Sequence, residues 1–547
     1  MLKKIRNFIV DPFYLKVFFV ITSFLLVTTV TRPYIDGVIK FGILWASIVF
    51  FYDLFTERRV LKSHSMFLLV GFLVVFGTTI LINYEVEFKN NISSWLYTVC
   101  MLLVLYPYKG IHKEQALREI SVLNYTYLGL TCIGSTISFI LFLKQTTYWG
   151  EYYGLKYCMG VYDNRLFGIY LNPGIVLTSV AICLCIIQFF INHNRNEKRV
   201  GIHVFLAYSF IINFVCMALE NSKGAFIGMA AVCGFLCAFR LWKLLQNKKI
   251  LLRSAACFCI ILVSVGLFFG VISLSRSGLS YLPPLFMQNQ VSETKETQPS
   301  SDKPSRNNAA SQTEIEAANK EDSKRHASQV SETKETQLSS DKPSQNNAAS
   351  QVKIEATNKE NSKGHVSKVE MDRTEIPDNY GVMTGRPIIW RFGFTEFAKR
   401  PLLGYGPNYH THVQVLERPL THFHNLIVQC LVSVGSIGSF FILLFLALQF
   451  CYLLRRLFSQ NSNMLYASIF ALLFMLGINS MAEVTILFLI RPTAFVFWIY
   501  LGYLMAMSDS NNEKISLFDK PFYAVDQWLT KKTDIIKNRK AIHHGKK

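Results

Sequence analysis

The stretch Leu251–Leu274, LLRSAACFCIILVSVGLFFGVISL, contains a single charged residue, Arg253. A helix of this length measures about 36 Å, which is enough to cross the hydrocarbon layer of a bilayer. Apolar blocks of about 18 to 24 residues recur along the chain, which has 547 residues and is 51% hydrophobic. This pattern predicts an all-α fold, that of a polytopic integral membrane protein.

The apolar blocks divide the chain into membrane and loop regions. We expect about 12 transmembrane helices, at residues 12–31, 36–54, 65–83, 92–108, 122–143, 173–191, 202–219, 224–243, 251–274, 425–452, 464–482 and 485–507. The first is expected to be a span because no small-residue cleavage site follows it. The expected regions are a membrane domain at 1–274 with about nine spans, a large loop at 275–424, three spans at 425–507 and a basic tail at 508–547.

The formal net charge of +20 is distributed between alternate loops. Loops such as FTERRVLKSH at 55–64 are basic, whereas YEVEFKNN at 84–91 and the loop at Lys144–Gly174 are not. The positive-inside rule therefore assigns the basic loops and both termini to the cytoplasm, and the loops at Lys144–Gly174 and 275–424 to the outer side. Topology explains the charge, so we do not expect a nucleic-acid partner.

Two familiar kinds of chemistry are not indicated by the sequence. Nearly all of the twelve cysteines lie in apolar blocks, so neither a disulfide framework nor a CxxC metal site is expected. No phosphate-binding loop or dinucleotide fingerprint is present. Energy for a reaction would have to come from an activated substrate.

The large loop contains a tandem repeat at 290–367. A segment of 39 residues that begins at Gln290 recurs from Gln329 with a few substitutions. Its residues are polar and lack aromatics, so it cannot bury enough apolar surface to fold, and we expect a disordered insert. A solenoid is the alternative for a period of this size, but two copies without hydrophobic periodicity do not make a core.

Order is expected to return at 375–424, the segment that would carry the catalytic residues. The stretch MTGRPIIWRFGFTEF, Met383–Phe397, has Pro387 at a helix start, and the turn residues after Pro401 would end the helix. It predicts a short interfacial helix of about three turns. Its apolar residues Ile389, Trp390, Phe394 and Phe397 would face protein or lipid.

Cationic residues near the outer ends of spans are candidates for binding phosphate. They are Arg386, Arg391, Arg165 and Lys223. Arginine offers a planar fork of donors that matches phosphate oxygens and stays charged at any relevant pH. The alternative for each is that of an ordinary interfacial anchor that binds lipid phosphates.

A group of histidines precedes the tenth expected span: His410, His412, His422 and His424. Imidazole titrates near neutrality and can take a proton from a sugar hydroxyl. A metal site is a rival interpretation because HxH pairs occur twice, although Glu417 is the one acidic residue close in sequence. A third alternative, for His410 and His412, is that they are surface residues without a role. His424 is followed by Asn425 at the mouth of a span, where an unpaired polar pair is unfavourable without a function.

The last expected helical pair carries one acid and one base near its outer end, Glu483 and Arg491. They either pair with each other at the interface or take part in function.

The order of motifs from 384 to 440 resembles the C-terminal region of the O-antigen ligase and polysaccharide polymerase superfamily, the Wzy and WaaL type proteins. In those proteins a TGRxxxW helix leads to a PxxGxG turn and then to an HNxxL sequence that opens a glycine-rich span. The matching residues here are Thr384, Gly385, Arg386 and Trp390, then Pro401, Gly404 and Gly406, and then His424, Asn425 and Leu426.

Two earlier stretches also resemble this superfamily. NRLFGIYLNPG, at 164–174, resembles an outer-loop motif, and NSKGAF, at 221–226, resembles a Ser-Arg-Gly segment with Lys223 in place of arginine. Lysine keeps the charge but loses the bidentate geometry. The repeat insert departs from the family pattern.

The resemblance implies metal-independent glycosyl transfer, without a cofactor, at the extracytoplasmic face of a bacterial cell membrane. The donor would be an undecaprenyl diphosphate-linked oligosaccharide. His424 would be the base and Arg386 a diphosphate clamp, and His422 remains the alternative base. The expected substrate-binding residues are Arg165, Lys223, Arg391, His422, Asn425 and Trp390.

Three functions are then open. The first is a polymerase that joins lipid-linked repeat units into a capsular or O-antigen-like chain, with a chain-length regulator protein as a further partner. The second is a ligase that passes a finished glycan to a lipid, teichoic acid or protein. The third is a flippase of lipid-linked sugar, which is expected to have polar or broken helices near the bilayer midplane. The polar motifs gather on one outer face instead, which favours surface chemistry.

Overall fold

A computed structural model describes residues 2–152, 155–162, 165–194, 199–220, 223–284, 386–412, 414–415, 418–420, 422–458, 463–508 and 519–531. All of them belong to one unit, which comprises residues 1–287 and 368–547. The tandem repeats and the disorder predicted for them lie outside the described residues.

The described residues are mostly helical. The helices are α1 (Leu2–Val10), α2 (Pro12–Leu26), α3 (Arg32–Phe55), α4 (Arg59–Lys62), α5 (Met66–Ile82), α6 (Phe88–Cys100) with the π-helical η1 (Met101–Leu105), α7 (Lys113–Leu143), α8 (Pro173–His193), α9 (Val200–Leu219), α10 (Lys223–Leu244), α11 (Ile250–Leu279), α14 (Arg386–Lys399), the 3₁₀-helix η3 (Tyr409–His412), α15 (Leu426–Leu457), α16 (Met464–Ser480) and α17 (Pro492–Ser508). The strands are β1 (Thr147–Tyr152), β2 (Leu155–Tyr162), β3 (Arg165–Gly168), β4 (Gln414–Val415) and β5 (Arg418–Pro419).

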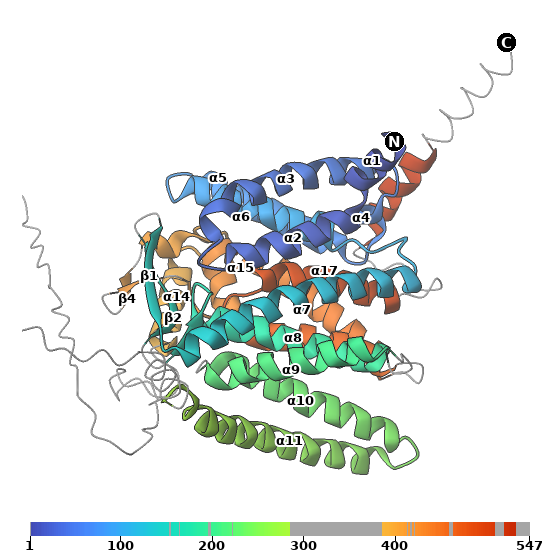
Figure 1. Ribbon diagram of the computed structural model, residues 1–547. Coiled ribbons are helices and arrows are strands. Elements are labelled where there is room, and N and C mark those ends of the chain that lie inside the picture. The colour runs from blue at the N-terminus through green and yellow to red at the C-terminus, as the bar shows by residue number, and fades with distance from the viewer. Residues whose placement is uncertain are drawn as a thin grey trace, which may run out of the picture. The chain divides into compact units, whose positions relative to one another are not determined.

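The long helices lie side by side, so their connections gather at two ends (Figure 1). The basic connection α10–α11 lies at the right-hand end in this view, where the N-terminus also lies. Helix α14 and strands β1, β2 and β4 lie at the opposite end. The loops that the charge pattern assigned to the cytoplasm are therefore separated by the length of the bundle from the segment predicted to carry the site.

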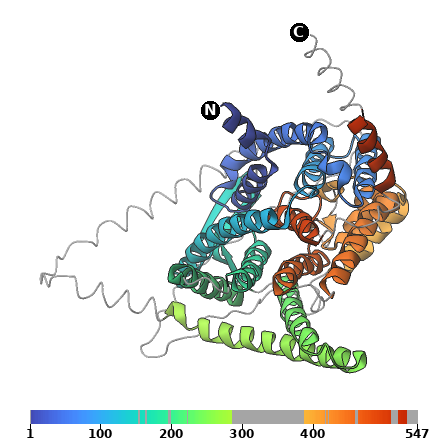
Figure 2. The same ribbon diagram turned by 90° about the vertical axis from the view of Figure 1, so that its right-hand side faces the viewer.

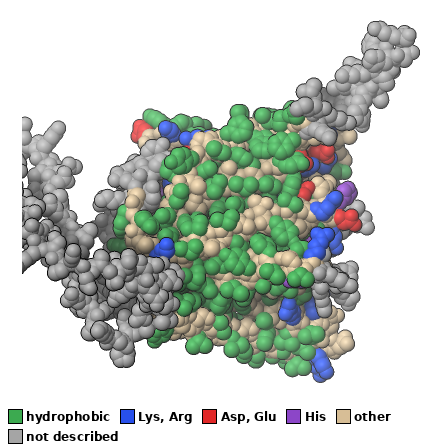
Figure 3. Space-filling model, in the orientation of Figure 1, with side chains coloured by type: hydrophobic (Ala, Val, Ile, Leu, Met, Phe, Trp, Pro, Cys, Tyr) green, Lys and Arg blue, Asp and Glu red, His purple; other side chains and the backbone are tan. Residues whose placement is uncertain are grey.

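The outer surface of the bundle is apolar. In the most apolar part of α11 only 6% of the residues are buried, and large side chains such as Phe258, Leu262 and Leu267 are exposed. Figure 2 shows α10 and α11 at the edge of the bundle. Figure 3 shows hydrophobic side chains across the middle of one face, with charged side chains toward its right end. Exposed apolar surface of this extent is favourable in lipid and unfavourable in water, which indicates a membrane protein.

Seven described helices are long and apolar enough to cross a membrane: α3, α7, α8, α9, α10, α11 and α15. Four shorter apolar helices accompany them, α2, α5, α16 and α17. Each of the predicted spans overlaps one of these helices or, at 92–108, the continuous pair α6 and η1. That all of them cross the membrane stays a prediction.

The predicted start of the last span, residue 485, is wrong. Helix α17 begins at Pro492, and residues 481–491 form a loop. Apolar side chains of this loop, among them Leu487 and Phe488, are buried in the core, which explains why the stretch looked like part of a span. Its backbone carbonyls find partners within the bundle: Thr493 Oγ1 donates to Thr485 O at 2.7 Å, and Trp498 Nε1 donates to Ile486 O at 2.8 Å.

The prediction of an all-α fold is also incomplete, because the structure contains short β-strands. The predicted loop Lys144–Gly174 contains an antiparallel sheet of the three strands β1, β2 and β3 in that order. Strand β1 reads TYWGEY, which is rich in residues that favour strands. The sheet packs on α7 through β2 and β3, so it is attached to the bundle.

Helix α15 is broken near its start, and the segment after α14 fills the break. Gly435 has φ 63° inside the helix. The N–H groups of Tyr405 and Gly406 donate to the carbonyls of Val432 and Ser433 at 2.9 and 2.8 Å, and Ser436 N–H donates to Pro401 O at 2.7 Å. The broken helix therefore keeps its backbone hydrogen bonds, as a membrane protein requires. The PxxGxG turn is thus part of the scaffold that supports the site.

A helical segment near the C-terminus, 519–531, packs at the end that carries the basic loops. Arg58 Nη1 donates to Thr530 Oγ1 at 2.6 Å and lies 3.4 Å from Asp526 Oδ1. The N–H of Ser65 donates to Asp519 Oδ1 at 2.5 Å. These contacts attach part of the predicted cytoplasmic tail to the bundle.

Candidate functional site

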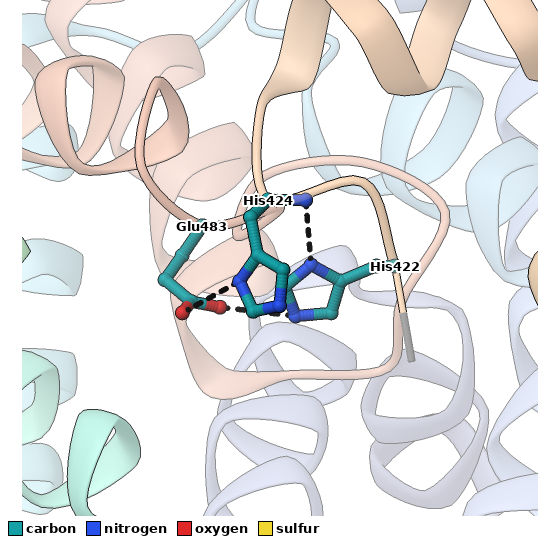
Figure 4. Close-up of side chains that lie close together, drawn as sticks. All are labelled: His422, His424 and Glu483. Carbon is teal, nitrogen blue, oxygen red and sulfur yellow. Dashed lines mark hydrogen bonds and ion pairs between the residues drawn. The ribbon is translucent and has the colours of Figure 1, made fainter. Parts of the chain in front are cut away.

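Several of the predicted site residues contact one carboxylate, that of Glu483. Glu483 lies in the loop between α16 and α17, and its carboxylate contacts His422, His424 and Arg386 (Figure 4 shows the two histidines). The distances are 3.0 Å from Oε2 to His422 Nε2, 3.1 Å from Oε1 to His424 Nδ1 and 3.4 Å from Oε1 to Arg386 Nη2. Residues from three separate segments of the chain therefore meet at Glu483.

His422 is held as a neutral imidazole. Its Nδ1 accepts a hydrogen bond from the backbone N–H of His424 at 3.1 Å, so its proton lies on Nε2, which faces Glu483. Burial lowers the pKa of His422 to about 4, even though Glu483 acts in the other direction. Because both ring nitrogens are engaged, His422 is poorly suited to take a proton from a substrate.

His424 has the geometry of a general base. Its Nδ1 donates to Glu483, which leaves the lone pair on Nε2 without a hydrogen-bond partner among the described residues. Its ring is partly exposed, with 25% of the side chain accessible. The backbone of His424 has φ 50°, a left-handed conformation that a residue with a side chain adopts only where its surroundings enforce it. Of the two histidines that the sequence left open as the base, this geometry favours His424.

Glu483 is the residue that orients this histidine. Burial raises its pKa, but the hydrogen bonds from His422 and His424 outweigh that effect and hold the pKa well below its usual range. The carboxyl is therefore ionised at neutral pH. An ionised acid beside Nδ1 of a histidine fixes the tautomer and stabilises the imidazolium that forms when Nε2 takes a proton.

Helix α14 brings Arg386 to the carboxylate. The helix packs tightly on the start of α15 at Gly393, where a Cβ atom would lie 2.5 Å from the side chain of Val428. Trp390 is partly buried against this contact, and its Nε1 has no hydrogen-bond partner among the described residues. Arg391, on the same helix, is exposed. The predicted helix is confirmed, and its interfacial position stays a prediction.

Asn425 holds the loops of the site together. It is the N-cap of α15, where its side-chain oxygen accepts from the N–H groups of Ile427 and Val428. Its Nδ2 donates to the carbonyl of Met481 at 3.1 Å, two residues before Glu483. These contacts give Asn425 a positioning role, and its predicted contact with substrate stays a prediction.

The other two predicted cations, Arg165 and Lys223, are not found among the described contacts of Glu483. Arg165, on β3, forms an ion pair with Glu220, with 3.2 Å between Nη2 and Oε1. Glu220 is fully buried at the end of α9, so the pair ties the sheet to the bundle. The backbone of Lys223 begins α10 three residues after Glu220, and its side chain lies outside the described part. A phosphate contact for either residue stays a prediction.

The alternative of a metal site now involves Glu483 as the candidate third ligand, and not Glu417, which is close to the histidines in sequence. His422, His424 and Glu483 are a group that by residue type can hold a metal ion, whereas Glu417 lies outside the described residues. A metal needs a lone pair from each histidine. The N–H on Nε2 of His422 points at Glu483 instead, so this arrangement fits a hydrogen-bonded cluster better than a metal centre.

The remaining histidines of the group are separate from the cluster. His410 is buried, and its Nδ1 is 2.9 Å from the carbonyl of Pro407. Burial lowers its pKa, which is consistent with a structural residue. The side chain of His412 lies outside the described residues.

Sequence reasoning singled out Glu483 but did not connect it with the histidines. The signal was an acidic residue in an otherwise apolar stretch near the outer end of a span. Its suggested partner was Arg491, which interacts with Glu483 electrostatically, whereas the ion pairs described for Glu483 are with His422, His424 and Arg386.

In comparisons with known proteins, no protein-family model and no curated protein matches the chain.

Proposed function

We propose that the protein is a glycan polymerase of a bacterial cell membrane that spans the bilayer about 12 times. It transfers an undecaprenyl diphosphate-linked oligosaccharide onto a sugar hydroxyl of another lipid-linked repeat unit, at the outer face. The observation that carries the proposal is the pair of His424 and Glu483 with Arg386 beside it. His424 and Arg386 lie in the segment predicted to face outward and belong to the motifs that resemble the polymerase and ligase superfamily, and Glu483 follows the predicted outer end of α16.

The residues of the cluster have distinct parts in this reaction. Nε2 of His424 takes the proton of the acceptor hydroxyl while the hydroxyl oxygen forms a bond to the anomeric carbon of the donor sugar. The bond between that carbon and the phosphate oxygen breaks, and the diphosphate leaves with the electron pair. Arg386 stabilises the charge that develops on the leaving group, and Glu483 stabilises the imidazolium of His424.

The proposed chemistry needs no metal ion. The activated donor supplies the leaving group, and arginine supplies positive charge that a divalent cation would otherwise provide. A transfer assay in excess EDTA tests this point. Unchanged transfer is expected, and loss of transfer that zinc or magnesium restores would assign the cluster to a metal instead.

The experiment that tests the function is deletion of the gene in its host, with lipid-linked and surface glycans separated by size. A polymerase predicts that single lipid-linked units accumulate on the outer side and that wild-type protein, but not His424→Ala, restores long chains. Full-length chains left on the lipid carrier would indicate the ligase reaction. Units trapped on the cytoplasmic side would indicate a flippase, and both results would overturn the polymerase.

A further inference from the structure

A second arginine lies beside the cluster, and the mechanism above does not use it. Arg491 is the last residue of the loop that carries Glu483, directly before α17. The two residues line one narrow pocket, together with Asn172, Thr178, Thr485 and Thr493. The pocket therefore connects the carboxylate of the site with the start of α8, where the NRLFGIYLNPG motif ends.

The guanidinium of Arg491 interacts electrostatically with Glu483, but it shares that carboxylate with other groups. The oxygens of Glu483 are engaged by His422, His424 and Arg386, and Arg491 forms no ion pair within 4.0 Å and no side-chain hydrogen bond in the described part of the chain. It is partly buried, and its charge contributes to the lowered pKa of His422. Two guanidinium groups, those of Arg386 and Arg491, therefore share the single negative charge of Glu483. A partly buried excess of positive charge is unfavourable, which indicates that an anion completes the site.

The walls of the pocket also favour an anion. Asn172 is the N-cap of α8, a helix of 21 residues, and Thr493 is the second residue of α17. Backbone N–H groups at the starts of helices carry partial positive charge. Together with Arg491 they give the pocket a positive environment.

We propose that Arg491 is a substrate-contacting residue that binds a phosphate group of the polyprenyl diphosphate, next to the pair of His424 and Glu483. This inference rests on the proposed function for the identity of the donor. It adds a cation that none of the recognised motifs includes. With Arg386 on α14 and Arg491 before α17, the leaving group would be held by two guanidinium groups from different parts of the fold.

Binding of the carrier without its glycan tests this assignment apart from the transfer reaction. The full-length protein is purified into phosphatidylcholine nanodiscs, and its affinity for undecaprenyl diphosphate is measured. We expect Arg491→Gln to weaken binding at least tenfold and Arg491→Lys to give an intermediate affinity, since lysine keeps the charge but not the fork of donors. Arg455→Gln is the matched control, because Arg455 is exposed near the end of α15 that lies away from the site.

The outcomes separate this inference from the proposed function. Equal affinity of wild type and Arg491→Gln for undecaprenyl diphosphate overturns the role of Arg491 and does not affect the proposed polymerase function. If phosphatidylglycerol competes as well as undecaprenyl diphosphate, the pocket binds lipid phosphate in general and the inference is overturned. A wild-type protein that does not bind the carrier refutes both proposals. If Arg491→Gln does not fold, the comparison of Arg491→Lys with wild type decides.

Discussion

Nδ1 of His424 lies 3.1 Å from Oε1 of Glu483, although the two residues are 59 positions apart in the chain. One residue precedes α15 and the other follows α16, so the pair forms only when these helices pack. An ionised acid behind a histidine is the arrangement that prepares the opposite ring nitrogen to take a proton. This contact turns two polar residues at the ends of apolar segments into one candidate catalytic unit.

Replacement of His424 should remove transfer and leave the protein folded. We expect His424→Ala to lower the rate of glycan transfer by about 10²- to 10⁴-fold, the usual contribution of a general base. His410→Ala serves as a control for loss of a nearby histidine outside the cluster. The measurement is the single-turnover rate with a lipid-linked donor, and a normal rate in His424→Ala would refute the assignment.

Glu483→Gln should lower the transfer rate without removing the side chain. Glutamine is neutral, and its amide N–H₂ would face either the Nε2–H of His422 or the Nδ1–H of His424. We expect a loss of about 10²-fold or more in the rate, because the imidazolium of His424 loses its counter-charge. Glu85→Gln is the control, an exposed acid in another loop. Equal rates in both variants would show that Glu483 has no part in the reaction.

Stability should fall in mild acid because of His422. Its folded-state pKa of about 4 is below the ordinary value of 6.5, so the folded protein binds this proton less readily than the unfolded chain. The contribution of His422 is complete above pH 6.5 and is lost as the pH falls toward 4. It amounts to roughly 3 kcal/mol, from 1.36 kcal/mol per pKa unit.

Thermal unfolding of the purified protein between pH 7 and pH 4 measures this effect. Glu483 acts in the same direction, because its depressed pKa means that its stabilising contribution is lost as the pH falls below its ordinary value of 4.5. His422→Gln keeps a donor toward Glu483 and removes the titration of the imidazole. The loss of Tm between pH 6.5 and 4 should therefore be smaller in this variant, and an unchanged slope would contradict the prediction.

The glycines of the PxxGxG turn should be required for folding. Gly404 has φ 67°, and a Cβ there would lie 2.4 Å from the carbonyl oxygen of Val432. We expect Gly404→Ala to destabilise the protein by at least about 2 kcal/mol, since neither the backbone angle nor the contact can relax cheaply. Gly266→Ala, in α11, has open space around the added methyl and should change Tm little. Comparable Tm values for the two variants would contradict the account of the break in α15.

Deletion of Gln290–Ser367 should be tolerated. The unit that contains every described helix of the site comprises residues 1–287 and 368–547, so the deletion removes no described contact of the cluster. We expect the shortened protein to insert in the membrane and to transfer glycan at a rate within about twofold of wild type, which is our estimate for an insert outside the site. Loss of long chains in the host, with normal amounts of protein, would show that the repeats have a function.

Reporter fusions test the membrane topology. A periplasmic or surface reporter inserted between the two repeats should be active, and a cytoplasmic reporter fused after Lys547 should be active as well. The control inserts the surface reporter in the basic connection of α10 and α11, where it should be silent. A reversed pattern would place the cluster of Glu483 on the cytoplasmic side and remove the basis of the proposed function.

The sequence alone predicted most of the helices and the candidate residues, because hydrophobic length and local motifs are properties of adjacent residues. The apolar block at 251–274 identified a membrane helix without reference to any partner. The helix that begins at Arg386 was recognisable from Pro387 and the turn after Pro401. The order of TGR, GYG and HN motifs gave His424 and Arg386 as candidates.

Tertiary structure decided how these residues work together. The loop before Pro492 is as apolar as a span, and only packing shows that it leaves the helix and brings Glu483 to the histidines. The choice of His424 over His422 as base depends on one backbone N–H that fixes the tautomer of His422. Such contacts join segments far apart in the chain, and a pattern of adjacent residues carries no information on their distance in space. The sequence thus determined a membrane protein of apolar helices with a polar segment before α15, and the fold determined which of its polar side chains form a candidate site.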